Sequence, residues 1–231
     1  MGRRQGGGKG LILAAFDLII FDYDGVVADS ELLNNAILVD LLTEVGMPTT
    51  LDEALSAYVG KRWLDCLSLI EARFGPCPEG LHDEWTRRCH ARAPLELAPV
   101  PGALDFMRSR DERRCIASSS PLDWIKMGLS RFGLTSTFGG PIYSATVHVT
   151  RGKPHPDLFL HVAAEMQVDP ARTLVIEDSI SGVAAGVAAG MTVVGLCAGG
   201  HMREGDGERL RNAGAHHVVD DYAAISAILD A

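Results

Sequence analysis

The stretch LIIFDYDG, residues 18–25, decides the fold of this chain. Its first four residues are apolar, and Asp22, Asp24 and Gly25 lie in the four that follow. A short run that is apolar throughout is typical of a parallel strand buried on both faces. Glycine lets the chain turn sharply after such a strand. The stretch therefore predicts a buried strand that delivers two carboxylates to one edge of a sheet.

Apolar runs of the same kind recur along the chain, at residues 115–117, 174–176, 193–196 and 217–219. Segments with helical periodicity lie between the runs, at residues 103–110, 157–166 and 181–189, and Gly190 closes the last of them. An alternation of buried strands and helices is typical of a doubly wound parallel sheet. We therefore predict an α/β fold.

Three of the predicted strands stop at polar residues. They end at Asp22, at Ser118 and at the pair Glu177-Asp178. Ligands of open parallel sheets bind beyond the carboxyl ends of the strands. We therefore expect these side chains to line one site.

One segment interrupts the alternation, because residues 34–98 have helical periodicity and no convincing strand. The segment ends in Pro99-Val100-Pro101-Gly102, which is typical of a stiff turn. We predict an inserted helical cap at 34–98, an α/β core formed by 16–33 and 99–231, and a disordered tail at 1–15.

Composition excludes several classes of protein. A net charge of −9 over 231 residues disfavours a nucleic-acid partner or a membrane surface, since both usually require a basic face. Five cysteines without a CxxC pair disfavour a disulfide framework and a zinc site. The first ten residues lack the apolar segment of a secretory signal. We expect a cytoplasmic protein without a membrane partner, as a monomer or a weak homo-oligomer.

The strand-end residues suit phosphate chemistry. Two carboxylates two positions apart can divide the roles of nucleophile and acid. A phosphate dianion beside them needs cations, and oxygen ligands such as those of Glu177 and Asp178 suit Mg²⁺. Lys153, in GKPHPD at residues 152–157, is a candidate counter-charge. Each feature also has an ordinary structural explanation: a turn for the paired aspartates, a solvated surface for the lysine and helix caps for the serines.

Four segments in this order resemble the four motifs of the haloacid-dehalogenase superfamily, across nearly the whole chain from Phe16 onward. They are DYDGVVADS at 22–30, ASSS at 117–120, GKPHPD at 152–157 and VIEDSISGVAAGVAAG at 175–190. The resemblance implies a Rossmannoid core with a small helical cap between the first two motifs. It is closest to the subgroup of β-phosphoglucomutases and sugar-phosphate phosphatases.

The resemblance also implies roles for single residues. Asp22 would be the nucleophile that forms an aspartyl-phosphate, and Asp24 the acid and base that serves the leaving oxygen and then water. The residues implied to bind Mg²⁺ are Asp22, Asp24 through its carbonyl, Asp178, and Glu177 directly or through water. The residues implied to hold the phosphoryl group are Ser118, Ser119, Lys153 and Gly25.

We therefore expect a Mg²⁺-dependent phosphatase that hydrolyses a small phosphorylated metabolite, either a sugar phosphate or a phosphorylated sugar acid. Substrate specificity would lie in the cap, at Lys61, Arg62 and Trp63, although a plain helix-surface role for the two cations is about as common.

Two alternatives remain open. A β-phosphoglucomutase-type isomerase shares the four motifs, but that subfamily places a histidine, an arginine and a lysine where Asn34, Trp63 and Pro121 stand here. The missing groups for a second phosphate favour the hydrolase. The second alternative, an inactive binding or scaffold protein, is disfavoured because all four motifs are complete.

Overall fold

The computed structural model describes residues 16–59 and 63–231. The predicted tail at 1–15 and the predicted specificity residues Lys61 and Arg62 lie outside the described residues.

Six strands form one sheet in the order β3-β2-β1-β4-β5-β6, and every neighbouring pair is parallel. The strands are β1 (Leu18–Phe21), β2 (Arg114–Ser118), β3 (Ile142–Ser144), β4 (Thr173–Glu177), β5 (Thr192–Leu196) and β6 (His217–Val219). In the central register, Phe21 of β1 aligns with Ile116 of β2 and Ile176 of β4. The carboxyl ends of these three strands therefore meet at one edge of the sheet.

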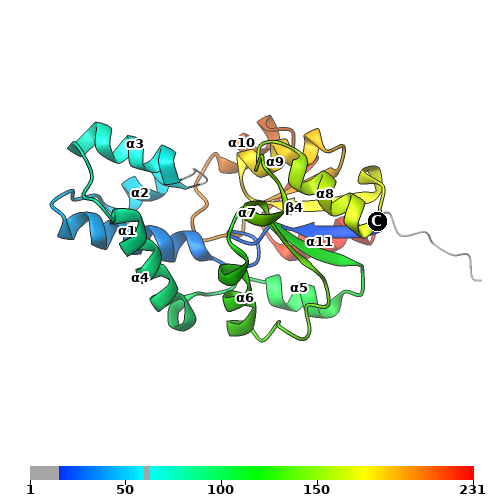
Figure 1. Cartoon of the computed structure of the whole chain (residues 1–231). Coiled ribbons are helices and arrows are strands. Elements are labelled where there is room, and N and C mark those ends of the chain that lie inside the picture. Colours follow the sequence, from blue (N-terminus) through cyan, green and yellow to red (C-terminus); the bar gives the residue numbers. More distant parts are fainter. Residues whose placement is uncertain (1–15, 60–62) are drawn as a thin grey trace, which may run out of the picture.

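Helices cover both faces of the sheet (Figure 1). One face packs against α5 (Ala103–Ser109), α6 (Leu122–Arg131) and α11 (Tyr222–Leu229). The other packs against α8 (Asp157–Met166), α9 (Ile180–Ala188) and α10 (Asp206–Asn212). Two short helices, α7 (Ala145–His148) and the 3-10 helix η1 (Pro170–Arg172), complete the core. Alternate residues of β1 point to opposite faces: Ile19 and Phe21 join one apolar cluster, whereas Leu18 and Ile20 join the other.

The predicted α/β class is confirmed by this arrangement. All five predicted strands and the three predicted core helices occur, with ends that shift by one residue at most. Strand β3 was not predicted, because only one of its three residues, Ile142, is aliphatic, whereas the equally short β6 contains two valines. The uncharged stretch 180–198 forms α9 and β5, and no helix among the described residues is long and apolar enough to cross a membrane.

Four helices between β1 and β2 lie together beside the sheet (Figure 1). They are α1 (Ser30–Glu44), α2 (Leu51–Tyr58), α3 (Trp63–Phe74) and α4 (Leu81–Glu96), and they enclose an apolar cluster of their own. Helix α1 begins at Ser30, four residues before the predicted cap boundary. The division into a cap at 34–98 and a core stays a prediction.

The chain enters and leaves this helical group through two adjacent segments. The Asp29 N–H donates to the Ala98 carbonyl (2.9 Å), and the Val100 N–H donates to the Val27 carbonyl (3.0 Å). Arg131 of α6 secures the returning segment, because its guanidinium donates to the carbonyls of Pro94, Leu95 and Leu97. The end of α4 is thereby fixed against the core.

We expect Gly128→Ala to lower the free energy of unfolding. A Cβ at Gly128 would lie 1.6 Å from the hydroxyl oxygen of the fully buried Tyr23 and 3.1 Å from Leu97. Overpacking of this kind typically costs about 1–3 kcal/mol. Gly207→Ala in α10 is the matched control, since its Cβ would meet nothing closer than 3.4 Å and alanine favours a helix by up to about 1 kcal/mol. Equal stability of the two variants in urea titrations would contradict this packing.

Candidate functional site

A buried lysine joins the ends of two central strands. The Lys153 Nζ donates to Asp22 Oδ1 (2.8 Å), to Glu177 Oε1 (2.5 Å) and to the Ala117 carbonyl (3.2 Å). Its side chain is 5% exposed, and that of Glu177 is fully buried. The predicted counter-charge is thus in contact with Asp22, and its alternative as a solvated surface lysine is wrong.

Backbone pairing sets this geometry. The Asp22 N–H donates to the Ile176 carbonyl (3.0 Å), which continues the β1–β4 ladder one residue past Phe21 and places Asp22 beside the end of β4. Lys153 comes from the loop before α8, where the Lys153–Pro154 peptide is cis, and its Nζ lies 5.2 Å from the ring centre of Phe159. Residues 131 positions apart therefore meet.

The buried carboxyl groups around Lys153 outnumber its single positive charge. Burial, and then the Glu177 carboxylate, raise the pKa of Asp22 well above its ordinary value, against the opposing effect of Lys153. Burial lowers the pKa of Lys153, but the two carboxylates outweigh it, so the pKa rises and the lysine stays protonated. Asp178 adds a third carboxylate, and its pKa is also raised, chiefly by burial. One lysine therefore faces three buried carboxyl groups, which suits a divalent cation.

The oxygen atoms of this group fit Mg²⁺. Carboxylate oxygens of Asp22, Glu177 and Asp178 lie within 4.8 Å of one another. Oxygen-only donor sets are those that Mg²⁺ prefers. The side chain of Asp24 is not part of this group among the described residues, so a metal role for Asp24 would rest on its carbonyl.

Both carboxylate oxygens of Glu177 already accept hydrogen bonds. Its Oε1 accepts from Lys153, and its Oε2 accepts from the N–H groups of Asp178 and Ser179 (both 3.2 Å) and from the Ser179 hydroxyl (3.0 Å). Helix α9 lies directly over this carboxylate, because a Cβ at Gly182 would be 1.9 Å from its carbon. Glu177 is thereby held rigidly at the base of the site.

Gly25 lets the loop after Asp22 pass close to Asp178. Its φ of +75° is a left-handed conformation that favours glycine. A Cβ at this position would lie 1.6 Å from Asp178 Oδ2. The residue therefore allows the two sides of the site to approach, and the predicted sharp turn is present.

Asp24 is held by three donors. Its Oδ1 accepts from the Ser30 hydroxyl (2.6 Å) and the Trp124 indole Nε1–H (3.0 Å), and its Oδ2 accepts from the Ser120 hydroxyl (2.5 Å). We did not predict roles for these donors. Ser30 and Ser120 lie within the quoted motifs, whereas Trp124 carries no sequence signal that separates it from an ordinary core aromatic.

The two predicted serines after β2 differ. Ser118 is buried, 1% exposed, and its Oγ accepts from the Ser120 N–H (3.0 Å). It follows Ala117, whose carbonyl binds Lys153, so it lies at the same sheet edge as Asp22. Ser119 is exposed.

Trp63 begins α3 and stacks on an aromatic residue of α4. Its ring is 5.0 Å from that of Trp85, with an interplanar angle of 15°, and 4.7 Å from that of His82. The Trp85 indole N–H donates to the Asn34 carbonyl (3.0 Å). These ring contacts of Trp63 are thus with residues of α4.

Two ionisable residues beside the site were not predicted. His201 is 4% exposed, and its Nε2 lies 3.1 Å from Asp178 Oδ2. Burial lowers its pKa, but the contact with Asp178 outweighs this and raises it. The pKa of Glu31, in the first turn of α1, rises to about 7, first through burial and then through the charges of Asp24 and Asp178.

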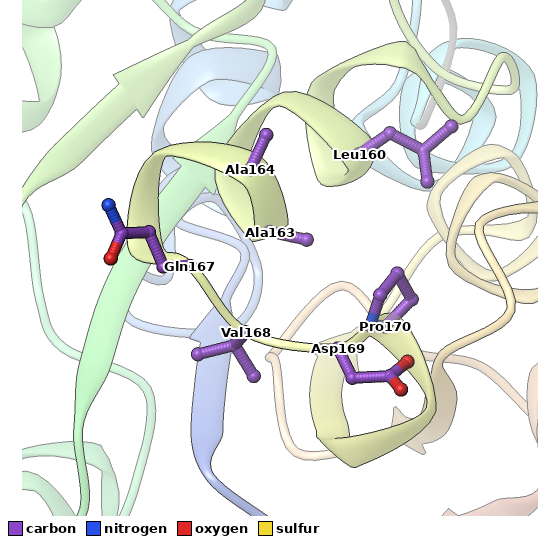
Figure 2. A pocket seen from close by; sticks show the side chains of 7 residues that line it. All are labelled: Leu160, Ala163, Ala164, Gln167, Val168, Asp169 and Pro170. Atoms are coloured by element: carbon purple, nitrogen blue, oxygen red, sulfur yellow. The ribbon is translucent and has the colours of Figure 1, made fainter.

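An open surface depression lies elsewhere (Figure 2). Its lining residues are Leu160, Ala163, Ala164, Gln167, Val168, Asp169 and Pro170. They belong to α8 and to the segment that precedes β4, so the depression is at the sheet edge opposite Asp22. Among the predicted site residues that the structure describes, none lines it.

We expect Glu31→Gln to stabilise the metal-free protein, and more so at pH 8 than at pH 5. A folded pKa of about 7 above an unfolded value near 4.5 means that the stability present below pH 4.5 is lost as the pH rises through 7. The glutamine removes this loss, worth about 1–3 kcal/mol at pH 8. Urea titrations in chelator measure it.

Glu44→Gln is the matched control, because hydrogen bonds from Arg88 lower the pKa of Glu44 and keep it below this range. Its effect should be constant between pH 6 and pH 8. A pH-independent effect of Glu31→Gln would contradict the raised pKa.

Two solved structures share this fold closely. A haloacid dehalogenase-like protein of unknown function from Agrobacterium tumefaciens is 35% identical with a TM-score of 0.84, and the match covers 94% of this chain and 100% of that chain. A putative β-phosphoglucomutase from Thermotoga maritima is 26% identical with a TM-score of 0.73, and the match covers 93% of this chain and 99% of that one.

Curated relatives cover most of the chain as well. Hexitol phosphatase B of Escherichia coli is 32% identical over 187 residues, which are 78% of this chain and 81% of that protein. The 6-phosphogluconate phosphatase of the same organism is 23% identical over 193 residues, or 83% and 87% of the two chains. Residues 16–190 match the family described as haloacid dehalogenase-like hydrolase, and this chain belongs to that family.

Proposed function

We propose that the protein is a Mg²⁺-dependent phosphatase that hydrolyses a small sugar phosphate or phosphorylated sugar acid. The observation that carries the proposal is the buried contact of Lys153 with Asp22 and Glu177, beside Asp178. It gathers a nucleophile, a fixed cation and a metal-binding set at one strand edge. Positioning and charge stabilisation of this kind supply most of the catalysis in phosphoryl transfer.

Asp22 acts as the nucleophile. Its carboxylate attacks the phosphorus, the bond from phosphorus to the leaving oxygen breaks, and an aspartyl-phosphate forms. Lys153 neutralises Asp22 before the attack and the phosphoryl oxygens afterwards. Ser118, with the backbone of Ser119 and Gly25, holds the phosphoryl group at the same edge.

Asp24 moves the protons. It protonates the leaving oxygen as the first bond breaks, and then takes a proton from the water that attacks the aspartyl-phosphate. Inorganic phosphate leaves and Asp22 is regenerated. The three hydrogen bonds to Asp24 support this role, because they fix the carboxylate in one place.

Asp22, Asp178 and the Asp24 carbonyl would hold Mg²⁺, which when bound supplies positive charge to the phosphoryl oxygens. Glu177 would act through water or through its neighbours, since both its oxygens already accept hydrogen bonds. Its place under α9 supports this indirect role.

The substrate class is inferred from the relatives and the cap. The names of both curated relatives specify a phosphorylated sugar alcohol or sugar acid. Lys61, Arg62 and Trp63 remain our candidates for recognition of the rest of the substrate. The stacking of Trp63 on Trp85 supports a fixed position for the start of α3.

A phosphoglucomutase-type isomerase is the second candidate. The 26% identical structure from Thermotoga maritima favours it. Asn34 and Trp63 stand where that subfamily carries its second set of charged groups, which favours hydrolysis. Release of inorganic phosphate from a panel of sugar phosphates, followed beside product isomerisation, separates the two activities.

Asp22→Asn should abolish phosphate release, by roughly 10³-fold or more. Asparagine keeps the shape of the side chain but is a poor nucleophile, and Lys153 retains Glu177 as a partner, so the fold should persist. Circular dichroism checks folding, and mass spectrometry excludes deamidation. High activity in an intact, folded variant would refute the nucleophile assignment.

Asp178→Ala should weaken Mg²⁺ binding by at least about tenfold. The change removes one of the three clustered carboxylates. Isothermal titration calorimetry with Mg²⁺ measures the affinity directly, without turnover. Asp83→Ala, at an exposed cap position, is the control and should bind as the wild type does. An unchanged titration of Asp178→Ala would refute its role as a ligand.

A further inference from the structure

We propose that Trp124 and Ser120 are positioning residues that hold Asp24 in place for proton transfer to the leaving oxygen. The inference rests on the role of Asp24 under the proposed function. It adds two residues to which neither the motifs nor the relatives give a role, and it concerns the step that distinguishes a poor leaving group from a good one.

Donors bind both oxygens of Asp24, and the Ser30 hydroxyl is a second donor to Oδ1 (2.6 Å). Trp124 Nε1–H donates to Asp24 Oδ1 at 3.0 Å, and the Ser120 hydroxyl donates to Oδ2 at 2.5 Å. A carboxylate that is held by only one oxygen can still turn about its Cβ–Cγ bond. Donors on both oxygens fix its plane as well as its place.

Both donors are themselves fixed. Trp124 is 5% exposed, lies in the first turn of α6 and belongs to the apolar cluster on that face of the sheet. The Ser120 N–H donates to Ser118 Oγ (3.0 Å), and its carbonyl accepts from the buried Ser144 hydroxyl (2.6 Å). Asp24 is therefore tied to the same backbone segment as Ser118, the proposed phosphoryl-binding serine.

The two donors differ in chemistry. A hydroxyl can donate or accept, whereas an indole N–H only donates. Oδ1 therefore remains an acceptor from Trp124 throughout the reaction. Oδ2 is the oxygen that can carry a proton, because the Ser120 hydroxyl can turn and accept from it. The proton passes from Oδ2 to the leaving oxygen, and the attacking water later returns one to Oδ2.

Trp124 also contacts the cap. Its ring centre lies 5.5 Å from that of His90 in α4, at an interplanar angle of 57°. The indole thus packs on a cap helix while its N–H holds Asp24. The position of the Asp24 carboxylate therefore depends on how α4 packs against α6.

The test compares two substrates that differ in the leaving group. A nitrophenolate leaves without a proton, whereas the alkoxide of sorbitol 6-phosphate needs one. Trp124→Phe keeps the ring and removes the N–H, and Ser120→Ala removes the hydroxyl. The comparison uses kcat/KM, because it reports the steps up to formation of the aspartyl-phosphate and leaves out its later hydrolysis, in which Asp24 serves both substrates alike. We expect kcat/KM with sorbitol 6-phosphate to fall about 10–100-fold in Ser120→Ala and about tenfold in Trp124→Phe, where Ser30 still donates to Oδ1. With 4-nitrophenyl phosphate kcat/KM should change less than about threefold.

Two matched variants serve as controls. Ser120→Thr retains a hydroxyl and should restore most of the loss. Ser109→Ala removes a hydroxyl that donates to the Phe106 carbonyl in α5 rather than to Asp24, and it should not separate the two substrates. Equal losses with both substrates in Trp124→Phe and Ser120→Ala would overturn the proposal.

The same two substitutions, made in the Asp24→Asn variant, test whether Trp124 and Ser120 act through Asp24. Residues that act through Asp24 should produce no further selective loss once it is replaced. A further selective loss in that background would overturn the inference. If Asp24→Asn lowers kcat/KM equally for both substrates, the proposed role of Asp24 as the acid fails, which is a different outcome from the failure of Trp124 and Ser120 alone.

Discussion

The ion pair of Lys153 with Asp22 and Glu177 is the contact on which the site depends. Three segments far apart in sequence meet at this ammonium group: the end of β1, the loop before α8 and the end of β4. Removing one partner from a buried pair leaves an uncompensated charge, which typically costs about 3–5 kcal/mol. The lysine is therefore required for the geometry of the sheet edge as well as for its charge.

Two glycines let the backbone pass close to the carboxylates of this cluster. Gly25 leaves room for the Asp178 carboxylate, and Gly182 leaves room for that of Glu177. Desolvation of three carboxyl groups is unfavourable, and the backbone and hydroxyl donors of Ser179 offset part of it at Glu177. The site is thus a polar cluster beside an apolar core, and hydrogen bonds offset part of the cost of burying its carboxyl groups.

The site residues that lie at strand ends could be predicted from the sequence. Asp22, Glu177 and Asp178 each follow an apolar run, and parallel strands bring such positions to one edge. Residues whose role depends on contacts between distant elements could not be predicted from the sequence. Trp124 is 100 residues from Asp24 and has the helical spacing of a core residue. Strand β3, with the sequence IYS, lacks the aliphatic run that marks the other strands. His201 and Glu31 owe their environment to neighbours on other elements, which no local pattern records.

The paired segments at Val27–Asp29 and Ala98–Val100 have a consequence for how this architecture can vary. The segment by which the chain leaves the sheet and the segment by which it returns are hydrogen-bonded to each other. The connection between them is therefore closed at this point, whatever helices lie between the two segments. Loop-closure entropy changes only slowly with the length of an insertion. Helical groups of different size or shape could therefore be exchanged at this point while the cluster of buried charges at the strand ends is left intact.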